Sequence, residues 1–437
     1  MTVLKRLTLK GFKSFANPTV LEFGNNFNCV IGSNGSGKCL TYDELVPLAD
    51  GSLIKIGDLV EQKLKDHKPI LMDDGYTIPG DNTSILSLNL KNLKIESQPI
   101  QAFIKRTSPE YLLKIKTRSG REVTTTEYHP LFILENNVVK SVKAEELKEG
   151  IKIAVPRILP LEIKNKTFYE LLNLITKEDQ LYVSWRKELD DILRSIKKTT
   201  FKELAATMDI PFMIVKGVLC KQSINFYYLV KMLRFVGYSN DQIIALIPKV
   251  KSKNQHKEYN IPWKNSSELC RLLGYMLAEG RLPPKSDQIW FVNGNEEIVL
   301  DYVHLMKKVL KITPTINEYK PHCYDIIAYS APLRTILVKF GFGVNGTIHK
   351  DITNLILSHS DNKELGALLN GLYSGDGHVD KSCIELVTKS KKLEIALQSI
   401  LLRLGIISRS IPVIKMATNS GFSGLYYKIT INNVENF

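Results

Sequence analysis

The chain has 437 residues, with 59 lysines and arginines against 45 aspartates and glutamates, and a formal net charge of +14. This length predicts about two to four domains, because a single hydrophobic core rarely grows beyond about 250 to 300 residues. The basic balance favours a polyanionic partner, and nucleic acid is the first candidate. The sequence holds no run of about 18 apolar residues, so we expect no membrane partner and a cytoplasmic location.

Cysteine usage agrees with a reducing compartment. The six cysteines form no C-x-x-C pair and have no histidine cluster beside them, so neither a zinc site nor a disulfide framework is indicated.

The first 38 residues predict strands followed by a phosphate-binding loop. Apolar alternation indicates strands at 3–9, 20–23 and 27–31. The loop matches G-x-x-x-x-G-K, in which backbone N–H groups surround phosphate oxygens, and it consists of Gly32, Ser33, Asn34, Gly35, Ser36, Gly37 and Lys38. The next residue should be a Ser or Thr that holds Mg²⁺, but it is Cys39, whose thiol is a poor ligand for that ion. Either the loop is a chance match or a segment has been inserted directly after Lys38, and the sequence after Cys39 favours the insertion.

Residues 1–38 resemble the N-terminal end of structural maintenance of chromosomes (SMC) ATPases, which have ABC-type heads. The resemblance rests on LKGFKSF at 9–15 and on the phosphate-binding loop with its preceding strand. It implies an α/β P-loop fragment that binds ATP and Mg²⁺, and an SMC-type dimer as partner, after the interruption has been removed. ATPase activity therefore belongs to the parent protein, since the family's other ATPase motifs are missing from these 437 residues.

Residues 39–160 show short alternating strands with frequent turn residues, which predicts an all-β module. Strands are expected at 84–90, 112–117 and 151–155. Cys39, a T-x-x-H formed by Thr126 and His129, and an A-x-x-L-x-x-G segment at 144–150 follow in the order found in inteins. The region therefore resembles the N-terminal half of an intein splicing module, in the hedgehog/intein (Hint) fold.

These three side chains suit the self-cleavage of a peptide bond. Attack of the Cys39 thiolate on the Lys38 carbonyl would convert the Lys38–Cys39 peptide into a thioester. This shift is unfavourable unless the leaving nitrogen is protonated, so we expect His129 to act as general acid while Thr126 helps to hold the scissile peptide. The alternative is that Cys39 is a small buried residue and His129 a turn histidine before Pro130.

Residues 161–260 are helical and basic. Apolar spacing predicts helices at 168–175, 188–196 and 201–208. The segment 201–219 fits a helix-turn-helix whose second helix begins near Pro211, which would make this a possible DNA-recognition region. A plain helical hairpin explains the same pattern equally well.

Residues 261–437 contain one pattern twice. LLGYMLAEG at 272–280 and LNGLYSGDG at 369–377 each resemble the signature helix of LAGLIDADG homing endonucleases. Small residues recur every four positions in both helices, which lets two helices pack closely. Helix-start signals precede them, and a glycine ends each one; these are Asn265 with Glu268, Asp361 with Glu364, Gly280 and Gly377.

Close packing of the two helices would bring Glu279 and Asp376 together at their C-terminal ends. The carboxylates would repel each other there and oppose the negative ends of both helix dipoles. We therefore expect both to bind Mg²⁺, which could activate water and neutralise charge on a scissile phosphate. The alternative is a pair of core helices with acidic ends.

The segments after each helix also repeat. Strand, helix and strand at 289–292, 296–310 and 324–328 correspond to 384–387, 391–404 and 426–431. The LAGLIDADG resemblance implies an α+β fold with two pseudo-symmetric repeats, whose sheets bind double-stranded DNA, here the intein-less allele of its own gene. Lys428 falls where that family often carries a catalytic lysine. Asp325 holds the matching place in the first repeat, and Lys320 is only a weak substitute.

The sequence thus predicts a multidomain precursor fragment: an SMC-type ATPase start at 1–38, a splicing module at 39–160, a helical basic region at 161–260 and a LAGLIDADG endonuclease at 261–437 without its last helix. Intein C-termini finish with an Asn followed by Cys, Ser or Thr, and the end at Phe437 has no such pair. We therefore expect that this chain does not splice. Two alternatives are an inactive LAGLIDADG module that binds DNA or RNA, and a hedgehog-like autoprocessing protein.

Overall fold

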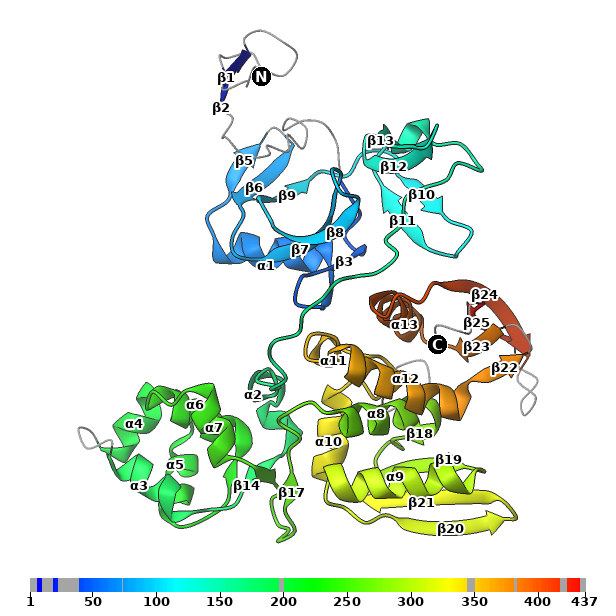
Figure 1. Cartoon of the computed structure of the whole chain (residues 1–437). Coiled ribbons are helices and arrows are strands. Elements are labelled where there is room, and N and C mark those ends of the chain that lie inside the picture. The colour runs from blue at the N-terminus through cyan, green and yellow to red at the C-terminus, as the bar shows by residue number, and fades with distance from the viewer. Residues whose placement is uncertain are drawn as a thin grey trace.

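The computed structural model describes residues 6–9, 19–22, 39–72, 74–195, 200–343, 350–380, 383–416 and 423–432. In chain order it contains a short strand pair, a β-rich lobe, a helical lobe and a lobe with two similar α+β halves (Figure 1). Among the described residues, no helix is long and apolar enough to cross a membrane.

Of the elements expected in residues 1–38, two strands are described. β1 (Arg6–Leu9) and β2 (Thr19–Glu22) pair antiparallel, close to the predicted positions. The strand expected at 27–31 and the phosphate-binding loop at 32–38 lie outside the described residues.

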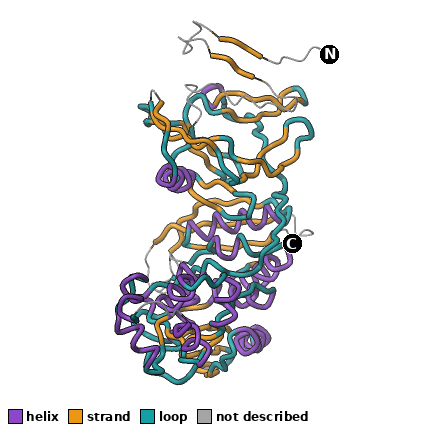
Figure 2. The backbone as a smooth tube through the Cα atoms, turned by 90° about the vertical axis from the view of Figure 1, so that its left-hand side faces the viewer, coloured by secondary structure: helices purple, strands orange, loops and turns teal. Residues whose placement is uncertain are grey.

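The β-rich lobe consists of small antiparallel sheets against which α1 packs. The strands pair as β3–β4, β5–β6–β9, β7–β8, β10–β11 and β12–β13, and strands dominate this upper part of the molecule in Figure 2. Leu59 and Val60 of α1 close a small core with Leu48, Ile78 and Phe103. The elements are β3 (Leu45–Pro47), β4 (Leu53–Lys55), α1 (Ile56–Asp66), β5 (Ile70–Met72), β6 (Gly75–Pro79), β7 (Ser84–Asn89), β8 (Lys94–Pro99), β9 (Ala102–Arg106), β10 (Leu113–Lys116), β11 (Glu122–Thr125), β12 (Pro130–Glu135), β13 (Val138–Lys143) and the 3₁₀ helix η1 (Ala144–Glu146).

Two expected elements in this part of the chain are wrong in extent. The segment 151–155 is not a strand: Ile153 forms a single bridge with Ile133 of β12, and the Ala154 N–H donates to the Phe132 carbonyl at 2.7 Å. The helix expected at 168–175 shrinks to α2 (Leu171–Leu174). Tyr169 and Glu170 form a turn ahead of this helix, and the preceding residue Thr167 forms a bridge with Lys264, a tertiary pairing that apolar spacing does not reveal.

The helical lobe is built from short helices and two-residue strands. Thr200 and Glu203 form a capping box at the start of α4, and α5 follows after a short turn, so the predicted two-helix unit is present; its DNA-binding role stays a prediction. The elements after α2 are η2 (Lys177–Asp179), β14 (Tyr182–Val183), α3 (Lys187–Ser195), α4 (Phe201–Thr207), α5 (Phe212–Leu219), β15 (Ile224–Asn225), α6 (Phe226–Phe235), α7 (Asn240–Leu246), β16 (Lys249–Val250) and β17 (Tyr259–Asn260).

The last lobe repeats one arrangement twice, as predicted. The strand order β18-β19-β21-β20 in the first half matches β22-β23-β25-β24 in the second. The first half holds α8 (Ser267–Glu279), β18 (Gly280–Arg281), β19 (Gln288–Asn293), α9 (Glu296–Val309), β20 (Thr315–Lys320), β21 (Cys323–Tyr329) and α10 (Ala331–Lys339). After α11 (Asn354–Leu357), the second holds α12 (Asn362–Asp376), β22 (His378–Asp380), β23 (Cys383–Thr388), α13 (Lys391–Arg403), β24 (Ser408–Met416) and β25 (Ser423–Ile431).

The helix ends agree only partly with the expected signals. Asp361 caps α12 in a capping box with Glu364, as predicted. Ser266, not Asn265, caps α8, because the Asn265 amide is used to contact the His359 carbonyl and the Ser360 hydroxyl at the start of the other helix. Both signature helices end at the predicted glycines, Gly280 and Gly377, in an extended conformation.

A hairpin of the β-rich lobe reaches the last lobe. The Ser410 N–H of β24 donates to the Ser119 carbonyl, at the tip of the β10–β11 hairpin, at 2.9 Å. Gly120 beside it has φ +86, and a β-carbon there would lie 1.7 Å from the Ser410 carbonyl oxygen. Only glycine suits this contact, for both its conformation and its size.

Candidate functional sites

Cys39 is held by the end of strand β11. Its N–H donates to the Thr126 hydroxyl at 3.0 Å, and its carbonyl accepts the Thr126 N–H at 3.1 Å and the Thr125 hydroxyl at 2.9 Å. Thr125 is fully buried and Thr126 nearly so, which limits their movement. The structure therefore fixes the orientation of the peptide nitrogen of Cys39, the atom that would leave in the expected reaction.

Thr126 and His129 belong to one tight turn. The His129 N–H donates to the Thr126 carbonyl at 3.1 Å, and the His129 carbonyl accepts the Ala144 N–H of η1 at 2.9 Å. His129 is half-buried and lies one turn after Thr126, the residue that contacts Cys39. The structure brings Cys39 and Thr126 into contact and joins His129 to Thr126 in one turn, while the catalytic role of each stays a prediction.

The environment of the Cys39 thiol disfavours the thiolate. Burial raises the pKa of Cys39 above its ordinary value, and the nearby positive charge of Arg106 opposes this shift in part. Arg106, at the end of β9, is mostly buried and pairs with Asp74 at 3.3 Å. The T-x-x-H motif did not predict that Arg106 and Thr125 lie beside Cys39. Arg106 comes close to Cys39 only in the tertiary fold.

The second candidate site lies where α8 and α12 pack through small residues. A β-carbon on Gly274 would lie 2.2 Å from the Leu368 carbonyl oxygen, and one on Gly375 would lie 2.5 Å from the Ala278 β-carbon. The predicted close approach of the two helices is therefore confirmed.

This packing brings the two acidic helix ends together. Burial raises the pKa of Glu279 above its ordinary value, and the negative charge of Asp376 raises it further. Burial also raises the pKa of Asp376, although the charge of Lys350 lowers it in part. The two carboxylates thus interact as expected, in a setting that disfavours their charges unless a cation accompanies them.

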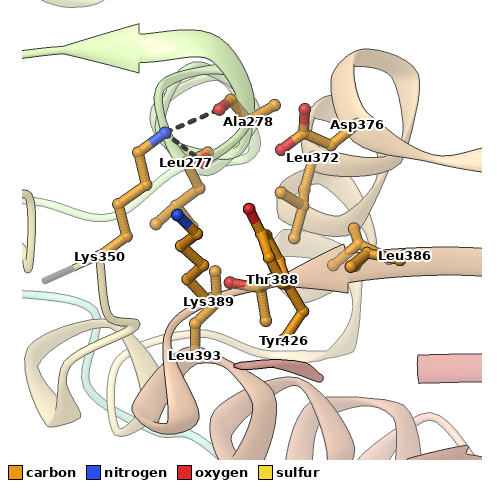
Figure 3. Close-up of a pocket in the computed structure, with 11 residues that line it drawn as sticks. Leu277, Ala278, Lys350, Leu372, Asp376, Leu386, Thr388, Lys389, Leu393 and Tyr426 are labelled. Atoms are coloured by element: carbon orange, nitrogen blue, oxygen red, sulfur yellow. Dashed lines mark hydrogen bonds between the residues drawn. The ribbon is translucent and has the colours of Figure 1, made fainter. Parts of the chain in front are cut away.

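Lys350 supplies a cation that the sequence analysis did not anticipate. Its ammonium group donates to the Leu277 and Ala278 carbonyls, both at 2.7 Å, and the side chain is buried (Figure 3). It satisfies two carbonyls at the negative end of α8, where helices leave such groups unpaired. Burial lowers the pKa of Lys350 to about 8 despite the two nearby carboxylates. No motif surrounds this lysine, so no sequence signal could have found it.

A cavity of about 240 Å³ opens beside these groups. The side chains of Lys389, directly after β23, and of Tyr426 on β25 extend towards the ends of α8 and α12 (Figure 3). The Lys389 ammonium lies 4.9 Å from the centre of the Tyr426 ring. The lining residues are Leu277, Ala278, Lys350, Leu372, Asp376, Leu386, Val387, Thr388, Lys389, Leu393 and Tyr426.

Lys428 does not line this cavity. It lies on β25 opposite Val387, and its ammonium pairs with Glu385 at 2.6 Å. In the first repeat Val292 lies opposite Asp325, so the predicted correspondence of Asp325 with Lys428 is confirmed by strand register. Lys350 and Lys389, rather than Lys428, are the lysines at the cavity.

The residues at the helix ends fit a Mg²⁺ ion. Mg²⁺ in nucleotide and nucleic-acid enzymes is bound by one or two carboxylates, several waters and substrate phosphates. Glu279 and Asp376 offer two hard oxygen ligands of this kind. Within the described ranges no group of three or more His, Cys, Asp or Glu side chains could enclose a metal ion alone, so the remaining ligands would come from water and phosphate.

Comparison with known families defines the class of protein. The family described as the intein splicing domain matches residues 46–437. Because this match covers most of the sequence, the chain belongs to the intein splicing domain family.

Two of the similar proteins are replication factor C small subunits. The chain is 26% identical over 408 residues to the replication factor C small subunit of Methanocaldococcus jannaschii, covering 93% of this chain and 16% of the relative. It is 40% identical over 131 residues to the protein of the same name from Pyrococcus furiosus, covering 30% of this chain and 14% of the relative. The chain therefore spans about a sixth or less of the length of these relatives.

Among solved structures, the PabCDC21-1 intein is 35% identical, with 29% of this chain and 75% of that chain covered and a TM-score of 0.27. The homing endonuclease I-DmoI in complex with DNA and Mn is 16% identical, with 39% of this chain and 92% of that chain covered and a TM-score of 0.28.

Proposed function

We propose that the splicing module of this chain rearranges the Lys38–Cys39 peptide by an acyl shift. A bond forms between the Cys39 Sγ and the Lys38 carbonyl carbon, the C–N bond breaks, and the thiol proton ends on the freed Cys39 amine. The observation that carries this proposal is the hydrogen bond from the Cys39 N–H to the Thr126 hydroxyl, at 3.0 Å. It holds the leaving nitrogen in one orientation, as catalysis by positioning requires.

The other contacts support distinct roles for the neighbouring residues. The Thr125 hydroxyl and the Thr126 N–H hold the Cys39 carbonyl, so the backbone after the scissile bond stays fixed while the thioester forms. His129 is the proposed acid that protonates the leaving nitrogen, because it shares one turn with Thr126. The raised pKa of Cys39 keeps its thiol mostly protonated near neutral pH, so the attack requires that this proton be removed.

The test is thiol-induced cleavage of the full 437-residue chain. Dithiothreitol attacks a thioester at Lys38 and should release the 38 residues that precede Cys39, as measured by intact-mass spectrometry. Cys39→Ala should abolish the release because it has no nucleophile, and His129→Ala should slow it strongly. A Cys39→Ala chain that still released the fragment would disprove this chemistry.

A second activity, double-strand cleavage of DNA, is supported by the α8–α12 helix ends. Glu279 and Asp376 lie together beside a cavity that also receives Lys350 and Lys389. Both carboxylates would hold Mg²⁺, which activates water and neutralises phosphate charge when bound. The proposed role of Lys389 is to attract a phosphate, whereas Lys350 balances the two carboxylates. The proposed substrate is the intein-less allele of the chain's own gene.

A DNA- or RNA-binding module without nuclease activity is the alternative for this lobe. A DNA duplex that spans the uninterrupted phosphate-loop codons distinguishes these two functions. A nuclease cuts the duplex when Mg²⁺ is added, whereas a binding module binds it without cutting.

For the host protein, we propose an SMC-type ATPase that binds ATP and Mg²⁺ and forms its dimer after splicing, in the cytoplasm. The sequence G-x-x-x-x-G-K at 32–38, broken directly before Cys39, supports this host. ATP hydrolysis by the ligated host but not by its unspliced precursor would support the proposal. A hedgehog-like module would instead transfer the acyl group to another acceptor and leave the phosphate-binding loop broken.

A further inference from the structure

Glu44 connects the segment that begins at Cys39 to the strand that holds it. Its carboxylate accepts the Thr124 N–H at 2.7 Å and lies 3.4 Å from the Thr41 hydroxyl, which donates to it. Thr124 is 80 residues away in the sequence. No motif in the sequence singled out this contact.

Both backbone polar groups of Thr124 are held by the segment after Cys39. Glu44 takes the Thr124 N–H, and the Thr41 N–H donates to the Thr124 carbonyl at 3.2 Å. The two residues that follow Thr124 on the chain are those that bind the backbone of Cys39. The position of Thr124 therefore determines where the Thr126 hydroxyl lies relative to the Cys39 nitrogen.

The backbone of Glu44 is itself fixed. Its N–H donates to the Thr41 carbonyl at 3.1 Å, and its carbonyl accepts the Ile56 N–H, at the start of α1, at 2.9 Å. The neighbouring acidic residue differs: the Asp43 side chain is 76% exposed and pairs with Lys55 on the surface. The backbone of Glu44 is thus held by two hydrogen bonds, and its carboxylate accepts a backbone N–H. The Asp43 carboxylate instead forms an ion pair at the surface.

We propose that Glu44 is a positioning residue for the acyl shift at Cys39. Its carboxylate holds β11 through the Thr124 N–H, so that the Thr126 hydroxyl stays on the Cys39 nitrogen. A hydrogen bond from a backbone N–H to a charged carboxylate is stronger than one to a neutral acceptor, which suits a contact that must fix geometry. This inference rests on the proposed acyl shift and names a residue that controls it.

The experiment measures dithiothreitol-induced release of residues 1–38 from the full chain. Glu44→Ala should slow release by on the order of 10- to 100-fold, the size of effect that a small misplacement of reacting groups produces. Glu44→Gln should restore most of the rate, because its amide oxygen still accepts the Thr124 N–H. Asp43→Ala is the matched control and should react like the wild-type chain. Circular dichroism and the Tm of each variant establish that the fold is retained.

Two further variants separate positioning from a general loss of stability. Glu44→Asp keeps the charge but shortens the side chain, so it should react as slowly as Glu44→Ala; wild-type rates in either variant would overturn the inference. In a Thr126→Ala chain, Glu44→Ala should slow the reaction little further, because its effect passes through Thr126. Full additivity of the two changes would also overturn it.

Failure of this inference differs from failure of the proposed function. If the wild-type chain releases no fragment with dithiothreitol, the acyl shift itself is disproved. If the wild-type chain releases it and the Glu44→Ala chain does so equally fast, only the role of Glu44 is disproved.

Discussion

Gly274 of α8 and Gly371 of α12 face each other so closely that a β-carbon on Gly274 would lie 3.1 Å from the Gly371 Cα. A β-carbon on Gly371 would in turn lie 2.3 Å from the Arg271 carbonyl oxygen. The backbones of the two helices therefore touch directly, and the distance between Glu279 and Asp376 depends on these two glycines.

Gly371→Ala should lower the Tm clearly. The added methyl group meets backbone atoms that cannot move without shifting a helix, and overpacking of this kind costs about 1–3 kcal/mol or more. Gly366→Ala in the same helix is the matched control, since a β-carbon there meets nothing within 4 Å. The control should leave the Tm unchanged or raise it, because alanine favours a helix over glycine by roughly 0.5–1 kcal/mol. Equal Tm values for the two variants would contradict the close packing.

The helix pair shows what the sequence could predict. Small residues every four positions in two matching segments were enough to predict the close approach of α8 and α12, because this requirement is local and repeated. The halves' strand and helix order also followed from apolar spacing. By contrast, two contacts made by the tertiary fold could not be predicted. Lys350 binds carbonyls of α8, and Asn265 does not cap α8 as expected but binds Ser360, 95 residues away in the sequence.

In the splicing module, too, contacts made by the tertiary fold could not be predicted from the sequence. The order of Cys39, Thr126 and His129 could be read from motifs, whereas Glu44 became visible only when the fold brought Thr124 beside it. A partner 80 residues away leaves no periodic signal in the sequence.

Glu279→Gln and Asp376→Asn should each abolish double-strand cleavage while DNA binding persists. Each change removes one oxygen ligand, and metal-ion catalysis contributes several kcal/mol, so the cleavage rate should fall by on the order of 100-fold or more. Cleavage of a duplex spanning the uninterrupted phosphate-loop codons measures the rate, and a gel-shift assay measures binding. Glu297→Gln, a change on the exposed start of α9, is the charge-matched control. Removal of metal with EDTA should stop DNA cleavage by the wild-type chain; cleavage that persists in EDTA would exclude the proposed chemistry.

Lys350→Met and Lys428→Met compare two lysine positions. Lys350 lies at the helix ends, and its loss leaves two buried carbonyls unpaired beside two carboxylates. We expect the Lys350 variant to lose more DNA cleavage than the Lys428 variant, since Lys428 pairs with Glu385 away from the cavity. The same duplex assay measures both rates. A larger loss in the Lys428 variant would favour Lys428 as the catalytic lysine, as the family resemblance implies.

The alkylation of Cys39 should require a high pH. Burial disfavours the charged thiolate and raises the pKa of this group above its ordinary value of 9.0. Since the thiolate is the reactive form, the rate should rise with pH and reach half its maximum above 9.0. Iodoacetamide labelling at a series of pH values, followed by peptide mass spectrometry, gives the profile. A midpoint below 9.0 would mean that Arg106 outweighs burial.

Arg403→Leu should destabilise the last lobe strongly. The buried guanidinium donates to the Leu357 carbonyl at 2.7 Å and to the Ser360 carbonyl at 2.6 Å. Its loss leaves both acceptors unsatisfied, at roughly 1–3 kcal/mol each. Arg409→Leu, at an exposed position of β24, removes the same charge and should change stability by no more than about 0.5 kcal/mol. Thermal unfolding of the two variants checks the difference, and similar Tm values would refute the role of Arg403.

The contact between Ser119 and Ser410 also bears on solubility. β24 is an edge strand of its sheet, and such an edge can pair with a strand of another molecule. The tip of the β10–β11 hairpin occupies the Ser410 N–H and crowds the Ser410 carbonyl, so the splicing module covers part of this edge. Ile414 and Met416 lie further along the same strand and are largely exposed. The last lobe, separated from the splicing module, would therefore carry a longer open edge beside exposed apolar side chains, and would aggregate more readily than the intact chain.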